Sequence, residues 1–374
     1  MTTRPRARDY GIPFRGSPGA WNAITDVAGI EVGYCTLIAG TARKGAPAPA
    51  VRTGVTAILP RGKNSKDPVF AGTFTLNGAG EMTGSHWVAE SGFLESPIAI
   101  TNTHSVGAVH EGIIEWQVRR KLMFGLFSLP LVAETFDGLL SDVNGFHVRP
   151  DHVHTALESA KTGTVAEGNV GGGTGMCLFQ WKGGSGTASR LVDSAAERHS
   201  VGAFVQGNFG KRADAVVAGI PVGVLLADAE SLADWADFGT ILGRGSIIVV
   251  VGTDAPLLPR QLDRLAKRAA LGIARTGGNG GNLSGDLVIA FSTANAGAAR
   301  TDAALSRIET LSNAALDPLF EAAADATEEA IVNALVAAET MVGVEGRRVS
   351  SIPVERLVEI LRAHNRLATA AVKR

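Results

Sequence analysis

The chain contains 374 residues, of which 45% are hydrophobic and 19% are charged, a composition too apolar and too weakly charged for a disordered protein. Its 35 basic and 36 acidic residues leave a formal net charge of −1, which argues against a general nucleic-acid or anionic-membrane binder. Two cysteines, Cys35 and Cys177, are too few for a disulfide framework or a metal cluster, and they indicate a reducing compartment.

The N-terminal segment MTTRPRARDYGIPFRG carries positive charge, but no apolar stretch follows it. No uninterrupted apolar run approaches the ~18 residues that a membrane-spanning helix needs. We therefore expect a soluble, cytoplasmic protein that acts on a small molecule or a peptide and has no nucleic-acid or membrane partner.

The first half of the chain alternates short strand-like runs with helices, and further strand-like runs follow. Glycine is frequent, at 46 residues, and clusters beside β-branched runs, which predicts a layered fold with many close turns. Strands are expected at 24–33, 55–60, 128–135, 201–207 and 219–227, and a helix over 107–122. The clearest strand is SIIVVVG at 246–252, whose continuous β-branched run predicts burial on both faces.

A helix is predicted directly after this strand, with Thr253 or Asp254 as its N-cap and Pro256 in its first turn. Its packed face recurs every three or four residues, at Leu258, Leu262, Leu265, Ala269 and Ile273. Another strand follows at 287–293, and Pro318 and Pro353 each open a helix in a mostly helical final ~75 residues. The only candidate domain boundary, 242–245, is too short for a flexible linker, so we predict one domain over residues 1–374.

The patterns of several common catalytic centres are absent. His152 and His154 alternate as ligands on a strand would, but HExxH, CxxC and a carboxylate cluster are missing, so we expect no metal. The glycine run at 171–175 lacks the strand, spacing and acid of a dinucleotide site, and no serine lies in GxSxG. A serine nucleophile in this chain would need a base other than an obvious histidine.

The pair Gly245 and Ser246, directly before the buried strand, offers such a base. Cleavage between them would give Ser246 a free α-amine, whose reference pKa of ~7.7 to 8.0 lets it act as general base for its own hydroxyl. Glycine suits the preceding position because it has no Cβ to shield its carbonyl from attack.

The string RGSIIVVVGTDAPL at 244–257 resembles the processing site of the self-cleaving N-terminal-serine aminopeptidases, the DmpA-type L-aminopeptidase/D-esterase-amidase family, which includes the β-peptidyl aminopeptidases. The resemblance runs from about residue 10 to 340 in the family's order, through NAITDVAGIEVG (22–33), FTLNGAGEMTG (74–84), ITNTHSVG (100–107), VAETFDGLLSDVNGFHV (132–148), GNVGGGTGM (168–176), VQGNFG (205–210) and LSGDLVIAFSTAN (283–295).

This resemblance implies a four-layer α/β/β/α sandwich, the fold also found in the ornithine acetyltransferases. It implies self-cleavage into an α chain of residues 1–245 and a β chain of residues 246–374, assembled as a homotetramer of αβ protomers. It implies no metal or organic cofactor.

The resemblance also implies roles for individual residues. Ser246 matches the nucleophile that first attacks Gly245 and then each substrate, and Ser284 and Asp286 match the pair that positions it. Asn208 matches the amide that stabilises the oxyanion, and Glu134 matches the carboxylate that holds the substrate's amino group; Asn102 is expected to line the site as well.

Two positions depart from the family pattern. Asp286 stands where β-peptidyl aminopeptidases carry the longer glutamate, and Leu139, in DGLLSD, replaces a tyrosine whose hydroxyl can assist near the oxyanion. Leucine cannot supply that hydrogen bond, so slower turnover or a preference for more apolar substrates is expected.

The sequence thus predicts an aminopeptidase or amidase with a serine nucleophile, acting on short peptides, amides or esters that bear a free amine. An acyltransferase related to ornithine acetyltransferase is one alternative, although those enzymes use threonine where this chain has Ser246. A ligand-binding relative that never cleaves is the other.

Overall fold

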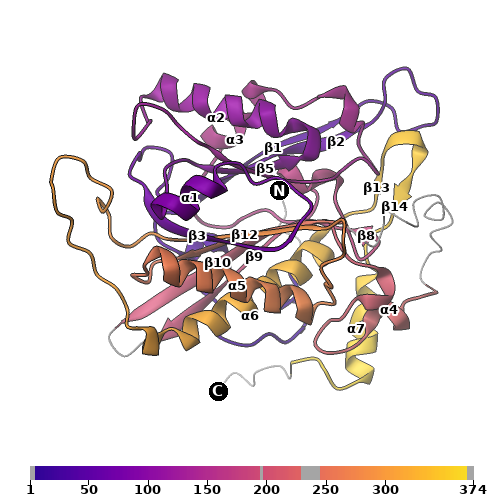
Figure 1. The fold of residues 1–374 in the computed structure, drawn as a ribbon. Helices are drawn as coiled ribbons and strands as arrows, with labels where there is room; N and C mark the ends of the chain where they lie inside the picture. Colours follow the sequence, from indigo (N-terminus) through magenta and orange to yellow (C-terminus); the bar gives the residue numbers. More distant parts are fainter. Residues whose placement is uncertain (1–4, 194–196, 229–244, 369–374) are drawn as a thin grey trace.

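The computed structural model of the protein describes residues 5–193, 197–228 and 245–368, and in Figure 1 these form four stacked layers. Two β-sheets lie face to face, and each is covered on its outer side by a pair of helices. The predicted α/β/β/α sandwich is therefore confirmed, within a single domain.

The four-stranded sheet has the order β1-β2-β5-β6, with β5 and β6 parallel and the other neighbours antiparallel. Helices α2 and α3 pack on its outer face over a core that includes Val55, Val109 and Leu157. The bounds are β1 (Glu31–Ala39), β2 (Val51–Leu59), β5 (Ile98–Asn102), β6 (Leu131–Thr135), α2 (Val106–Arg120) and α3 (Pro150–Glu158).

The six-stranded sheet has the order β4-β3-β12-β11-β10-β9, in which only β11 and β12 are parallel. Helices α5 and α6 cover its outer face. The bounds are β3 (Val69–Gly78), β4 (Phe93–Leu94), β9 (Gly184–Asp193), β10 (Arg198–Gly207), β11 (Ile247–Thr253), β12 (Gly285–Ser292), α5 (Pro259–Arg275) and α6 (Asp317–Ala337).

Strand β11 lies between two hydrophobic cores. Ile247, Val249 and Val251 face the helices, while Ile248 and Val250 face the other sheet. Successive side chains of a strand point to opposite faces, so a strand buried on both sides needs apolar residues at every position. All seven residues of β11 are buried, as the sequence predicted.

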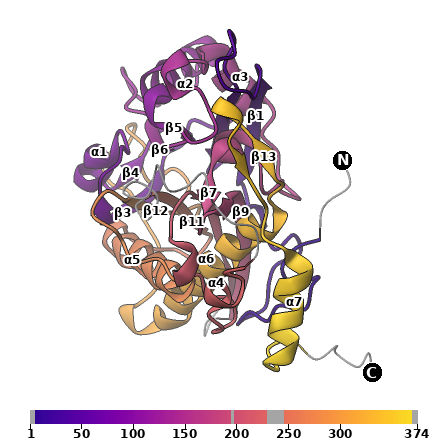
Figure 2. The same ribbon diagram turned by 90° about the vertical axis from the view of Figure 1, so that its right-hand side faces the viewer.

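The remaining elements lie at the ends and edges of the sandwich. Two hairpins, β7–β8 and β13–β14, form two-stranded sheets. Helix α7 lies at one end of the stack in Figure 2, and its Leu357 and Leu361 are buried in the same hydrophobic core as α5 and α6. The bounds are α1 (Ser85–Ser91), β7 (Cys177–Leu178), β8 (Trp181–Lys182), α4 (Val222–Leu225), β13 (Met341–Val342), β14 (Arg348–Val349) and α7 (Val354–Ala363). Within the described residues, no helix combines the length and the apolar character needed to cross a bilayer.

Several sequence predictions of secondary structure were wrong. The segment expected as a strand at 219–227 contains instead a short helix, α4, which begins at the buried Val222 and is capped by the buried Leu226, four positions on; a brief apolar run does not distinguish the two periodicities. Residues 24–26 form a 3₁₀ turn, and β1 begins only at Glu31. His152 and His154 lie on helix α3 instead of a strand.

The start of helix α5 was also predicted wrongly. It begins at Pro259, where the side chain of Gln261 accepts a hydrogen bond from the Leu258 backbone. Thr253 and Asp254 instead bond to the backbone of Ser200 on β10. The packed face of α5 was predicted correctly from Leu262 to Ile273. Helices α6 and α7 begin beside Pro318 and Pro353, as expected, and the β13–β14 hairpin separates them.

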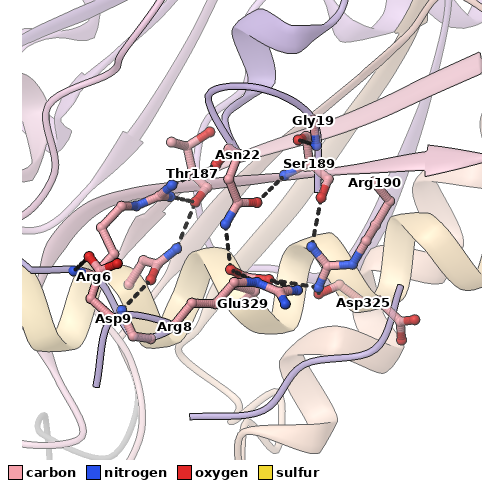
Figure 3. A network of polar contacts seen from close by, with 12 residues as sticks. Arg6, Arg8, Asp9, Gly19, Asn22, Thr187, Ser189, Arg190, Asp325 and Glu329 are labelled. Atoms are coloured by element: carbon pink, nitrogen blue, oxygen red, sulfur yellow. Dashed lines mark hydrogen bonds and ion pairs between the residues drawn. The ribbon is translucent and has the colours of Figure 1, made fainter. Parts of the chain in front are cut away.

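A buried ionic network connects the N-terminal segment with strand β9 and helix α6, as Figure 3 shows. Glu329 of α6 is fully buried and accepts bonds from two guanidinium groups, those of Arg8 and Arg190, each at 2.8 Å. Asn22 donates to the same carboxylate at 2.6 Å. One acidic side chain thus connects the N-terminal segment, β9 and α6.

We predict that Glu329→Gln lowers the free energy of unfolding by about 3 kcal/mol or more, because removing one partner leaves buried charge uncompensated. Chemical denaturation measures the change. Asp193→Asn is the matched control, since it removes one partner of an ion pair in which both side chains are well exposed, and it should have no measurable effect. Equal effects of the two substitutions would contradict the assigned role of the network.

Candidate active site

The predicted catalytic residues gather at one edge of the sandwich, where several strands begin or end. Ser246 and Ser284 directly precede the parallel strands β11 and β12, with Ile247 opposite Asp286. Asn208 directly follows β10, whose last residue, Gly207, pairs with Ile247. On the facing sheet, β6, which carries Glu134, contacts β11.

Ser284 contacts the peptide bond that would be cleaved. Its Oγ lies 2.6 Å from the carbonyl oxygen of Gly245 and 2.5 Å from Oδ1 of Asp286. The hydroxyl oxygen of Ser246 accepts a hydrogen bond from the backbone N–H of Gly285 at 3.0 Å. Two consecutive residues, Ser284 and Gly285, therefore bind the Gly245 carbonyl and the Ser246 hydroxyl, one on each side of the Gly245–Ser246 peptide bond.

The protons of this cluster can be assigned from its chemistry. A serine hydroxyl has one proton, so Ser284 can donate to the Gly245 carbonyl and keep its bond to Asp286 only if the carboxyl supplies a proton. Burial raises the pKa of Asp286 above its ordinary value, against the opposing hydrogen bonds from Ser284 and the Ile247 backbone. Burial thus makes the protonated carboxyl more stable than it would be in water, and aspartate is long enough to reach Ser284.

Gly245 is required by the close approach of two backbone segments. A Cβ at this position would lie 1.7 Å from the carbonyl oxygen of Asn208, a distance that no side chain can tolerate. The N–H of Asn208 in turn donates to the carbonyl of Ser246 at 2.9 Å. These contacts hold residues 245 and 246 against the end of β10.

The side chain of Asn208 is fixed by two backbone groups. Its Oδ1 accepts from the N–H of Cys177 at 2.7 Å, and its Nδ2 donates to the carbonyl of Phe136 at 2.8 Å. This pattern determines the orientation of the amide. An amide nitrogen has two N–H donors, so one remains for an additional acceptor.

Glu134 is buried close to Ser246, the candidate nucleophile. Its carboxylate accepts hydrogen bonds from the Thr103 hydroxyl and from the Glu81 backbone. A Cβ on Gly80 would lie 3.1 Å both from Oε1 of Glu134 and from the Cα of Gly285, the residue whose N–H contacts Ser246. Burial raises the pKa of Glu134, mainly through loss of hydration.

Among the described residues, the hydrogen bonds of Asn102 and the apolar contacts of Leu139 do not involve Ser246, Ser284 or Glu134. The Asn102 amide donates to Thr53 and to Asp137, which is fully buried and whose pKa burial raises to about 6. Leu139 packs against a small apolar cluster of Leu140, Cys177, Met341 and Val349. Both residues therefore lie around the site rather than within it.

Sequence reasoning did not identify Thr103, Asn77 or Asp137. Thr103 bonds to Glu134, and Asn77 donates to the carbonyl oxygen of Ser284 at 2.5 Å. All three occur in strings that carry the family resemblance, but only the fold shows which side chains meet. Among residues 5–193, 197–228 and 245–368, no group of three or more His, Cys, Asp or Glu side chains could hold a metal ion.

Comparison with known proteins decides the family. The model of peptidase family S58 matches residues 22–349. The chain belongs to peptidase family S58. This S58 peptidase is 52% identical to the β-peptidyl aminopeptidase BapA of Sphingosinicella microcystinivorans, over 98% of this chain and 94% of that protein. It is 46% identical to BapA of Sphingosinicella xenopeptidilytica, over 96% and 91% of the two chains.

Among solved structures, the S58 peptidase resembles the L-aminopeptidase D-Ala-esterase/amidase of Ochrobactrum anthropi, described as a prototype for the serine aminopeptidases and a variant of the Ntn hydrolase fold. The TM-score is 0.91, with 45% sequence identity, and the match covers 98% of this chain and all of that one. The fold expected from sequence is therefore that of a solved relative.

We predict that Ser284→Ala slows self-cleavage by about 10²-fold or more, because the Gly245 carbonyl loses the donor that would stabilise its negative charge. Loss of the full-length band with time in gel electrophoresis measures the rate. Ser292→Ala is the control: its hydroxyl, at the other end of β12, also donates to a backbone carbonyl, that of Ala255. If both variants process at the same rate, Ser284 does not assist cleavage.

Proposed function

We propose that this S58 peptidase is a self-processing serine aminopeptidase that cleaves itself between Gly245 and Ser246. The observation that carries the proposal is the 2.6 Å contact from Ser284 Oγ to the Gly245 carbonyl oxygen, beside the Ser246 hydroxyl. The substrates are short peptides, amides or esters with a free amine. The names of the relatives, β-peptidyl aminopeptidase and L-aminopeptidase D-Ala-esterase/amidase, support this substrate class.

Self-cleavage begins when Ser246 Oγ attacks the carbonyl carbon of Gly245. The negative charge that develops on the Gly245 oxygen is stabilised by the Ser284 hydroxyl, which Asp286 supports in turn. The C–N bond then breaks, its nitrogen takes up the proton lost by Oγ, and an ester joins Gly245 to Ser246. Hydrolysis of this ester leaves the Gly245 carboxylate and the free amine and hydroxyl of Ser246.

In each later turnover the Ser246 amine acts as the general base. With a reference pKa of ~7.7 to 8.0 it is substantially neutral near pH 8 and can accept the Oγ proton as Oγ attacks the substrate's acyl carbon. The second N–H of Asn208 stabilises the oxyanion, since the first is held by Phe136. The leaving amine or alcohol takes the proton, and water then releases the acyl group.

Glu134 binds the free amino group of the substrate. A buried carboxylate near the nucleophile can form a charge-assisted hydrogen bond with an ammonium group, and an internal peptide bond offers no such group. This contact explains removal of residues from the N-terminus rather than cleavage within a chain.

We predict that Ser246→Ala leaves a single chain of 38.7 kDa, whereas the unaltered protein separates into chains of 245 and 129 residues, about 25 and 13 kDa in proportion to length. Mass spectrometry and N-terminal sequencing measure the products. Cleavage of the variant at this bond would refute the assignment of the nucleophile. An uncleaved wild-type protein would favour the non-cleaving alternative.

We predict that Glu134→Gln raises KM at least about tenfold for an amine-bearing amide, because a hydrogen bond between charged groups is lost. The des-amino analogue of the same amide, which has no ammonium group to bind, should be affected little. In the unaltered enzyme, affinity for the amine should fall as pH drops through the raised pKa of Glu134, because protonation removes the carboxylate charge. Equal effects on both substrates would exclude the proposed contact.

We also propose that the processed protomers assemble as a homotetramer. Two adjacent residues of one loop, Leu126 and Phe127, expose apolar side chains, and this supports assembly because contiguous exposed apolar surface marks sites where a partner binds. Location in the cytoplasm stays a prediction from the sequence.

A further inference from the structure

Lys182 is a completely buried lysine that has no part in the proposed catalytic cycle. It is the second residue of β8, and none of its surface is exposed. Burying an ammonium group is costly unless its three N–H donors are satisfied. Among the described residues no carboxylate forms an ion pair with Lys182; backbone carbonyls surround it instead.

Two of these carbonyls lie at short distances. The Lys182 Nζ donates to the carbonyl oxygens of Met176 and Gly183, each at 2.8 Å. The carbonyl of Met176 belongs to the same peptide unit as the N–H of Cys177, and that N–H donates to Oδ1 of Asn208 at 2.7 Å. The ammonium group is therefore separated from the Asn208 amide by a single peptide unit.

The hairpin that carries Lys182 is also bound directly to the segment containing Asn208. The Phe179 N–H donates to the carbonyl of Phe209 at 2.7 Å, and the two phenyl rings pack edge to face. Phe179 and Gln180, at the turn, both have positive φ, of 51° and 59°. Residues with side chains disfavour this conformation, and such strain often occurs where a structure fixes a functional group.

The charge state of Lys182 fits an electrostatic role. Burial lowers the pKa of its ammonium group to about 8, so most molecules carry the charge at neutral pH. The neighbouring Cys177 thiol has a pKa raised to about 12 by burial, so it provides no thiolate counterion. The positive charge is thus held among neutral dipoles, where its field is weakly screened.

We propose that Lys182 is a positioning residue that strengthens Asn208 as the oxyanion donor, acting through the Met176–Cys177 peptide unit. A cation on the carbonyl oxygen makes the N–H of that unit a stronger donor to Oδ1, which in turn makes the Nδ2 protons more acidic. The charge contributes most when the substrate carbonyl becomes an oxyanion and least to ground-state binding. This inference rests on the proposed function of Asn208.

Steady-state kinetics of Lys182→Met tests the proposal. The variant should still cleave itself, because the donor to the Gly245 carbonyl is Ser284. Its kcat should fall about tenfold with KM unchanged, since the chain of hydrogen bonds to Asn208 loses its charged donor. Arg52→Met is the matched control: Arg52 is also buried and donates to the backbone carbonyls of Ala39 and Val342, but no such chain of bonds connects it to Asn208. Its loss should lower stability and leave kcat unchanged.

The outcomes separate this inference from the proposed function. If Asn208→Ala lowers kcat while Lys182→Met does not, the inference is wrong and the oxyanion assignment stands. A fall in kcat of equal size in the Arg52 variant would mean that Lys182 acts only through general stability, which also overturns the inference. If Asn208→Ala leaves kcat unchanged, the proposed function of Asn208 itself fails.

A measurement without substitution of Lys182 covers the case in which that variant does not fold. In uncleaved Ser246→Ala protein labelled with [¹⁵N]asparagine, the side-chain amide protons of Asn208 should shift upfield with a midpoint near pH 8, as Lys182 loses its proton. Asp137 and Cys177 titrate near 6 and 12, outside this range, and the uncleaved chain has no amine at residue 246. An amide signal that does not move between about pH 7 and 9.5 would overturn the inference.

Discussion

Parallel pairing of β11 with β12 is the contact on which the rest of the site depends. It places Gly285 beside Ser246 and Ser284 beside Gly245, with Asp286 opposite Ile247. Because side chains alternate between the faces of a sheet, a register shift of one residue would turn Ser284 and Asp286 away from the Gly245 carbonyl. The register is held by burial of both strands along their whole length between the two hydrophobic cores.

Burial also determines the electrostatics of the site. Glu134 and Asp286 lose hydration, which raises the pKa of each carboxyl, while the same loss lowers that of the Lys182 ammonium. The two carboxyl groups form hydrogen bonds with nearby hydroxyl or backbone N–H groups, and the Lys182 ammonium donates to backbone carbonyls. In the proposed cycle, a few charged or polar groups in a weakly screening environment would therefore act on the oxyanion, on the substrate amine and on the nucleophile.

The sequence predicted some elements well and others poorly, for identifiable reasons. The continuous β-branched run of β11 and the periodic face of α5 are long, unambiguous patterns, and both were predicted correctly. The run at 219–227 is too short to distinguish a strand from a helix, and the true start of α5 depends on Gln261, because Thr253 and Asp254 bond to β10 instead. Local signals fail where tertiary contacts use the same side chains.

By itself, the sequence determined the family, the layered fold and the identity of the candidate nucleophile, because these are written in strings of neighbouring residues such as RGSIIVVVG. Only the tertiary structure decided which distant groups meet: that Ser284 contacts the Gly245 carbonyl, that Asn102 turns to Asp137, and that Lys182 is buried behind Asn208. The reason is physical. Contacts between residues far apart in the chain depend on strand register and on burial, and neither can be read from the local order of side chains.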